Sequence, residues 1–175
     1  MLIGGALAGI AAAGLLRSAR GGARAESNSR RIALTNLHTG EHLDIEYFRR
    51  GYVGDALLSV QELLRDVRTG EAHAIDPHLI DYLCEVAARV GKEASFGVVS
   101  AFRSPPAQLD SQHASAGVAQ HGLHTQGRAI DVRMAGIDCA DLAAHAGSLQ
   151  CGGVGYYRAS NFVHLDTGAF RIWRG

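Results

Sequence analysis

The chain lacks an excess of charge of either sign. Its 175 residues contain 17 Lys or Arg and 17 Asp or Glu, so the formal net charge is zero. The first 25 residues hold three arginines and no acid, which leaves 14 basic against 17 acidic residues, or −3, in the remainder. A domain that binds nucleic acid needs basic residues to neutralise phosphates. The composition therefore excludes nucleic acid as the expected partner.

Long hydrophobic runs are also missing. The longest one, residues 2–16, has 15 residues, whereas a membrane-spanning helix needs about 20. Ala23-Arg-Ala25 follows it and resembles a signal-peptidase cleavage site. We expect residues 1–25 to be a signal peptide or an uncleaved N-terminal anchor, and residues 26–30 to be a polar linker. The arginines after the run are typical of a twin-arginine signal, although a Sec signal is an alternative.

Cysteine is scarce, and its pattern is uninformative about chemistry. Cys84, Cys139 and Cys151 are an odd set without Cys-x-x-Cys spacing, so at least one is unpaired within the chain. A Cys139–Cys151 disulfide would suit an oxidising compartment, but we expect buried thiols. There are also no repeats or low-complexity tracts, and residues 31–175 have room for one domain with a real core.

The periodicity of the domain predicts short strands mixed with helices, which indicates an α+β fold with a small antiparallel sheet and flanking helices. Asp76 and Asp138 are expected N-caps, and Gly91 a helix stop. Predicted helices cover 57–67, 79–90, 105–116 and 139–149; predicted strands cover 31–37, 43–48, 96–102, the segment around Asp131, 153–157, 162–167 and 170–173.

The most informative residues are two histidines and a carboxylate in the second half of the chain, His124, Asp131 and His164. Closed structural zinc sites usually have four protein ligands, often thiolates. Three nitrogen or oxygen ligands leave a fourth position for water, and such open sites are typical of hydrolases. The set therefore favours a catalytic zinc centre.

Strand alternation supports this interpretation. In Gly127-Arg-Ala-Ile-Asp-Val-Arg, Ala129 and Asp131 share one face of a predicted strand. In Phe162-Val-His-Leu-Asp-Thr, His164 and Asp166 share a face in the same way. Two neighbouring strands and a loop histidine would bring the three ligands together on a rigid support.

Each feature also has a simpler interpretation. His124 and Asp131 alone could form a hydrogen-bonded pair, and only the added His164 strand favours metal. The nearby Gly152, Gly153 and Gly155 would suit either a bend beside the metal strand or a simple turn. Other histidines are expected to be surface groups: His38, His42, His73, His78, His113 and His145.

Taken together, these motifs resemble a known family. His124-x-x-Gly127-x-Ala129-x-Asp131, followed by a histidine in a short strand, is similar to the zinc signature of peptidase M15, the zinc D-Ala-D-Ala carboxypeptidase family. The DUF882, or murein endopeptidase K-like, branch is most similar. The resemblance extends over residues 30–175 and includes the segments 31–48, 100–105, 152–157 and 162–168.

The resemblance implies a hedgehog-like zinc D-Ala-D-Ala peptidase fold, with Zn²⁺ bound by His124, Asp131 and His164. It also implies that Arg103 contacts the substrate. The planar guanidinium of an arginine suits a peptide carboxylate, because it can bind two oxygens at once.

This chain departs from the family pattern at the expected general base. Many members have Asp or Glu three residues before the last histidine ligand, and some have histidine two residues before it. Here these positions are Asn161 and Phe162. By strand geometry Asp166 is the nearest candidate base. Its alternative role is a carboxylate that orients a ligand histidine.

We therefore expect a zinc metallopeptidase that hydrolyses amide bonds in peptidoglycan peptides, with Asp166 and Arg103 as catalytic candidates. The branch resembled favours cleavage of cross-links. The alternatives are a non-catalytic zinc-containing module that binds cell wall, which Asn161 favours, and a D-Ala-D-Ala carboxypeptidase. Either enzyme would act in the periplasm or cell envelope, without stable membrane insertion once a signal is cleaved.

Overall fold

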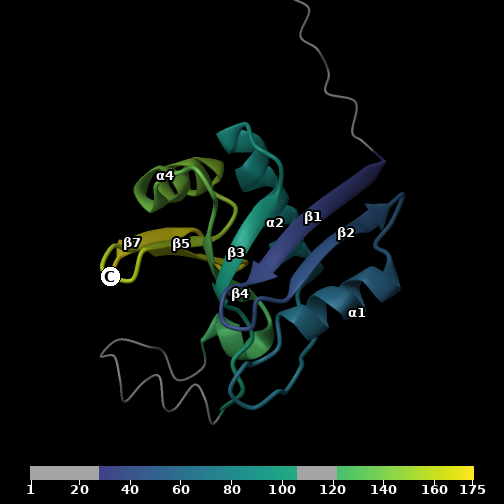
Figure 1. The fold of residues 1–175 in the computed structure, drawn as a ribbon. Coiled ribbons are helices and arrows are strands. Elements are labelled where there is room, and N and C mark those ends of the chain that lie inside the picture. Colours follow the sequence, from purple (N-terminus) through teal and green to yellow (C-terminus); the bar gives the residue numbers. More distant parts are fainter. Residues whose placement is uncertain (1–27, 106–121) are drawn as a thin grey trace, which may run out of the picture.

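A mixed sheet runs through the whole domain (Figure 1). The computed structural model describes residues 28–105 and 122–175. Within them, seven strands lie in the order β2-β1-β3-β4-β6-β5-β7. Their bounds are β1 Ser29–Asn36, β2 His42–Arg49, β3 Ser95–Ser100, β4 Ala129–Arg133, β5 Gly153–Tyr157, β6 Phe162–Asp166 and β7 Arg171–Arg174.

Two strand pairs are parallel, so the α+β class is confirmed but the expected purely antiparallel sheet is wrong. β1 pairs in parallel with β3, and β5 in parallel with β7, while the other four pairs are antiparallel. Parallel neighbours need a long crossover. Between β1 and β3 the crossover contains β2 and two helices; between β5 and β7 it contains β6. Sequence alternation alone does not reveal these connections.

Helices cover one face of the sheet. They are α1 (Gly54–Leu63), α2 (Pro77–Val90) and α4 (Cys139–Leu149), with a short 3₁₀ helix η1 (Leu123–Gln126) before β4. Figure 1 shows α1 beside β2 and α4 over the β5–β7 end. Tyr82 of α2 donates a hydrogen bond to the carbonyl of Ala146 in α4, at 3.2 Å. Aliphatic side chains from β3, β4, β5 and β6 fill the core beneath α2 and α4.

The predicted helix caps are confirmed. The Asp76 carboxylate accepts the backbone N–H of His78 at 3.0 Å, and that of Asp138 accepts Ala140 N–H at 2.7 Å. Gly91 ends α2 with a φ of 78°, a left-handed conformation that glycine adopts without a Cβ clash. Short polar side chains and glycine therefore set these boundaries locally, which is why the sequence reveals them.

The predicted helix 57–67 is wrong at both ends. α1 begins at Gly54 and ends at Leu63. Asp66 is 4% exposed, and its carboxylate accepts Arg68 N–H at 2.9 Å and both Ser104 N–H and Oγ–H, at 2.8 and 2.7 Å. A turn held by a buried carboxylate thus replaces the last helical turn, although the apolar spacing continues.

Other boundaries differ by a few residues. β1 begins at Ser29, inside the segment expected to be a linker, and β3 ends at Ser100, two residues earlier than predicted. The predicted helix 105–116, His113 and the predicted signal or anchor at 1–25 lie outside the described residues. Among the helices described, none has the length and apolarity needed to cross a bilayer.

The cysteines are free thiols, so the possible Cys139–Cys151 disulfide does not form. Cys139 is buried and Cys84 half-buried, but Cys151 is exposed, so the expectation of buried thiols is wrong for Cys151. Cys151 directly follows the left-handed residue Gln150, which ends α4.

Candidate metal centre

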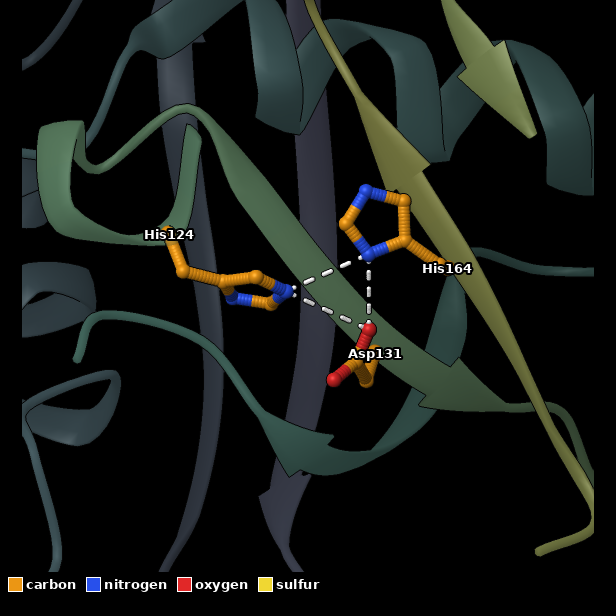
Figure 2. Close-up of side chains that lie close together, drawn as sticks. All are labelled: His124, Asp131 and His164. Carbon is orange, nitrogen blue, oxygen red and sulfur yellow. Dashed lines mark hydrogen bonds and ion pairs between the residues drawn. The ribbon is translucent and has the colours of Figure 1, made fainter. Parts of the chain in front are cut away.

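Two adjacent strands and a short helix bring the three sequence-predicted ligands together. β4 and β6 pair so that Asp131 lies directly opposite His164. Figure 2 shows His124 reaching from η1 toward this pair, so that all three side chains meet at one point. The ligand atoms lie within 4.8 Å of one another. The expected arrangement of two strands and a loop histidine is therefore present.

The facing atoms are His124 Nε2, His164 Nδ1 and Asp131 Oδ1. The two nitrogens are 3.2 Å apart, and the carboxylate oxygen is 3.4 Å from His124 Nε2 and 2.9 Å from His164 Nδ1. The exposed fractions of the side chains are 7%, 11% and 3% for His124, His164 and Asp131. The cluster is nearly closed to bulk solvent, with His164 the most accessible member.

His124 is held in the tautomer that metal binding requires. Its Nδ1 lies 2.5 Å from the carbonyl oxygen of Ala101, which can only accept a hydrogen bond, so Nδ1 carries the proton. Burial is the main cause of a lowered His124 pKa, and it outweighs the opposing effect of Asp131. The neutral ring therefore presents the Nε2 lone pair to the cluster.

His164 is oriented from its other side by Asp166. Its Nε2 lies 3.0 Å from Asp166 Oδ2, so Nε2–H donates and Nδ1 faces the cluster. Burial alone would lower the His164 pKa, but Asp131 and Asp166 raise it overall. His164 Nδ1 also lies 2.9 Å from Asp131 Oδ1, and a bound metal would have to replace this contact.

Asp131 is charged and supported on its outer oxygen. Burial alone would raise its pKa, but His124 and His164 lower it overall. Arg103 Nη2 donates to Asp131 Oδ2 at 2.7 Å, which leaves Oδ1 directed at the two histidines. A buried carboxylate that remains ionised is a suitable metal ligand.

The donor set fits zinc. Two ligands at 2.0–2.2 Å from a tetrahedral zinc lie about 3.3–3.6 Å apart, close to the 2.9–3.4 Å between the facing atoms. Metal-binding histidines almost always donate their other ring N–H to a carboxylate or a backbone carbonyl. His164 and His124 have these two partners, in Asp166 and Ala101 respectively.

Arg103 lies at the edge of the cluster on a firmly anchored segment. Its neighbours are both tied to the turn after α1, because Phe102 N–H donates to Leu64 O at 3.2 Å and Ser104 donates twice to Asp66. Its Nε donates to Ser100 Oγ at 2.9 Å, and its side chain is 22% exposed. The two contacts, with Ser100 and Asp131, use two of its five N–H bonds.

Asp166 has a different environment from the one expected of a base. It is 0% exposed. Oδ1 accepts the N–H groups of Gly153 and Gly168, and Arg171 donates to both oxygens, at 3.1 and 2.6 Å. Burial opposes ionisation, but His164, Arg171 and Gly168 lower the Asp166 pKa overall. With every neighbour donating to it, the carboxylate favours the orienting role over proton transfer.

Asn161 precedes β6 and is not one of the residues that face one another in the cluster. It lies in the exposed turn before that strand, with a φ of 52°. Phe162 is on the His164 face and stacks on Tyr157, with ring centroids 4.7 Å apart. Asn161 is itself exposed, and its side-chain amide cannot accept a proton as a carboxylate base would.

Several residues at the site are missing from the sequence-based set. Ala101 acts through its backbone, which no side-chain motif reveals. Arg171 and Trp173 come from the last strand, and the Trp173 ring lies 5.2 Å from that of His164. Their i, i+2 spacing in a short extended segment indicates one shared face. It does not indicate which neighbour that face contacts.

The histidines expected to be surface groups mostly are. His38, His42, His73 and His78 are exposed, whereas His145 is half-buried. His73 also stacks on Phe102, with centroids 4.8 Å apart. In the described residues, the one group of three or more His, Cys, Asp or Glu able to share a metal is the His124–Asp131–His164 cluster.

Comparison with known proteins agrees with the resemblance. A peptidase M15 family model described as peptidoglycan L,D-endopeptidase MepK matches residues 24–173. The protein of that name from Escherichia coli is 38% identical over 143 residues, covering 81% of this chain and 79% of the relative. The probable peptidoglycan L,D-endopeptidase MepK of Haemophilus influenzae is 36% identical over 146 residues, covering 82% and 78%. No solved structure matches. With its catalytic-type donor set and this similarity over most of its length, the chain belongs to the MepK family of M15 peptidases.

Proposed function

We propose that this protein is a zinc-dependent peptidoglycan endopeptidase that cleaves cross-links in the cell envelope. The observation that carries the proposal is the convergence of His124 Nε2, Asp131 Oδ1 and His164 Nδ1, each oriented by a hydrogen bond to its remote atom. The relatives are named L,D-endopeptidases. We accordingly propose that this chain cleaves a bond between an L- and a D-configured centre. We also propose a hedgehog-like zinc peptidase fold, and an N-terminal export signal before the domain, whose first strand begins at Ser29.

In the proposed mechanism, His124, Asp131 and His164 would hold the metal. A bound zinc would lower the pKa of a water molecule toward about 7 and would polarise the scissile carbonyl. Asp131 supplies the negative charge of the ligand set, and neutral His124 and His164 keep the net positive charge on the centre. Arg103, already fixed by Ser100 and Asp131, presents its remaining donors to a carboxylate or an oxyanion of the substrate.

We assign to Asp166 the orientation of His164 rather than proton transfer. A base needs a lone pair within hydrogen-bond reach of the reacting water. Both oxygens of Asp166 are occupied by donors, and it contacts the ring nitrogen that points away from the cluster. Its role would be to keep the proton on Nε2 and the lone pair on Nδ1.

The proposed function is tested by incubating zinc-loaded protein with purified peptidoglycan and analysing the released muropeptides. We expect cleaved cross-links of L,D configuration, loss of cleavage after chelation, and recovery when zinc is restored. Free D-Ala as the main product would establish the carboxypeptidase alternative. Binding without any product would establish the cell-wall module.

Arg103→Lys is expected to lower kcat/KM about 10–100-fold when both proteins are saturated with zinc. One ammonium cannot replace the guanidinium fork toward Ser100, Asp131 and a substrate group together. Losing a hydrogen bond to a charged group costs about 1.5–3 kcal/mol. Steady-state kinetics on a soluble cross-linked muropeptide measure the effect. Arg158→Lys, at an exposed position in the β5–β6 turn, is the matched control, and unchanged kcat/KM in Arg103→Lys would refute the substrate role.

A further inference from the structure

The edge strand β7 lies beside β5, in which the two positions next to Asp166 and His164 are glycines. β5 pairs with β6 so that Gly153 is opposite Asp166 and Gly155 is opposite His164. On its other side, β5 pairs with β7, with Gly153 beside Arg171 and Gly155 beside Trp173. The register therefore places Arg171 and Trp173 two strands away from the residues they contact.

The glycines are what allow that contact. A Cβ at Gly153 would lie 2.4 Å from Asp166 Oδ2 and 2.6 Å from Arg171 Nη1. A Cβ at Gly155 would lie 2.5 Å from Trp173 Cε2. The space above β5 is thus filled by side chains from β7 that cross it to reach β6. Gly153 and Gly155 lie within β5, so for these two glycines both the bend and the simple turn considered from the sequence are wrong.

Arg171 forms a bidentate ion pair with Asp166. Its Nη2 donates to Oδ2 at 2.6 Å and its Nη1 to Oδ1 at 3.1 Å. The Arg171 side chain is 46% exposed, whereas Asp166 is fully buried. The guanidinium therefore neutralises a buried carboxylate from the solvent side and fixes the plane of its two oxygens.

The orientation of the Asp166 carboxylate in turn sets the orientation of the His164 ring. Asp166 Oδ2 accepts His164 Nε2 at 3.0 Å, and Nδ1 faces the metal cluster. Trp173 limits rotation of the ring, because it lies 5.2 Å from His164 and packs under the Arg171 guanidinium at 4.9 Å. An unbroken series of contacts thus leads from Arg171 to a metal-facing atom.

We propose that Arg171 is a positioning residue of the metal centre, acting through Asp166 on His164 across the glycine positions of β5. The inference rests on the proposed zinc centre and deepens it, because it assigns to the last strand a role in metal affinity. Arg171 does not contact the facing ligand atoms itself; its effect is carried by the Asp166 carboxylate.

The test compares Arg171→Met, Arg171→Lys and the control Arg174→Met in the full chain. Arg174 is on the same strand but on the opposite face, where it lines the groove beside α4. Zinc affinity is measured by competition with a chromophoric chelator, the ligand field by the visible spectrum of the Co²⁺-substituted protein, and the fold by thermal unfolding of the metal-free protein.

We expect Arg171→Met to weaken zinc binding, with an upper bound of about 10–100-fold, the usual effect of removing a direct supporting partner of a ligand histidine such as Asp166. Its Co²⁺ spectrum should change, Arg171→Lys should restore part of the affinity, and Arg174→Met should match the wild type. If Arg171→Met does not fold, Arg171→Lys carries the comparison and should still bind zinc more weakly than the wild type.

Two results would overturn the inference, and they are distinguishable. If the wild-type protein binds zinc and an Arg171 variant has the same zinc affinity and Co²⁺ spectrum, only the proposed role of Arg171 is wrong. Wild-type protein that binds no zinc would overturn the metal centre itself, and this inference with it.

Discussion

Replacing His164 with alanine is expected to abolish both stoichiometric zinc binding and peptidoglycan cleavage. His164 supplies one of three facing ligand atoms, and the variant would leave a two-ligand site around a buried Asp131. Lewis-acid activation is worth several kcal/mol of transition-state stabilisation, and about 4 kcal/mol corresponds to roughly 10³-fold in rate. Cleavage should therefore fall by about 10³-fold or more.

Metal analysis and muropeptide release are measured on the same preparations of this variant. His78→Ala is the matched control, because the His78 side chain is 77% exposed and lies at the start of α2. The control should retain one zinc per chain and full activity. Full zinc occupancy in His164→Ala would show that the metal binds at another site.

Asp166→Asn is expected to lose zinc affinity and stability together. Five donors surround the carboxylate: His164 Nε2, two from Arg171, and the N–H groups of Gly153 and Gly168. An asparagine NH₂ must face at least two of these donors, whichever way the amide is turned. If it faces His164, the ring must accept at Nε2 and carry its proton on Nδ1, where the metal should bind.

The expected cost of Asp166→Asn in unfolding free energy is about 1–3 kcal/mol, that of a buried polar group without a partner. Zinc affinity should fall about 10–100-fold. Chelator competition and denaturant unfolding measure the two effects, with Asp141→Asn, an exposed acid in the first turn of α4, as the control. A rate loss of about 10²–10⁴-fold with zinc affinity unchanged would instead restore Asp166 as the general base.

Local patterns determined much of this protein from the sequence alone. Alternation along residues 129–133 and 162–166 placed Asp131 and His164 on strand faces that the structure brings together. Polar caps and a left-handed glycine marked the ends of α2 and the start of α4. These features are readable because each depends on residues within one turn or one strand. The family resemblance then joined the separate segments into one expected site.

The tertiary structure alone decided how those residues are used. Parallel pairing of β7 with β5 places Arg171 in contact with Asp166. The Ala101 carbonyl accepts a hydrogen bond from His124 Nδ1 and so fixes the tautomer of that ring. The sequence leaves Asp166 open between base and support, and only its hydrogen-bond partners favour one of the two. Such roles depend on contacts between strands that are distant in the sequence, and a period-2 pattern specifies a face without naming its neighbour. The sequence therefore indicated which side chains converge, and the sheet order determined which neighbours each of them contacts.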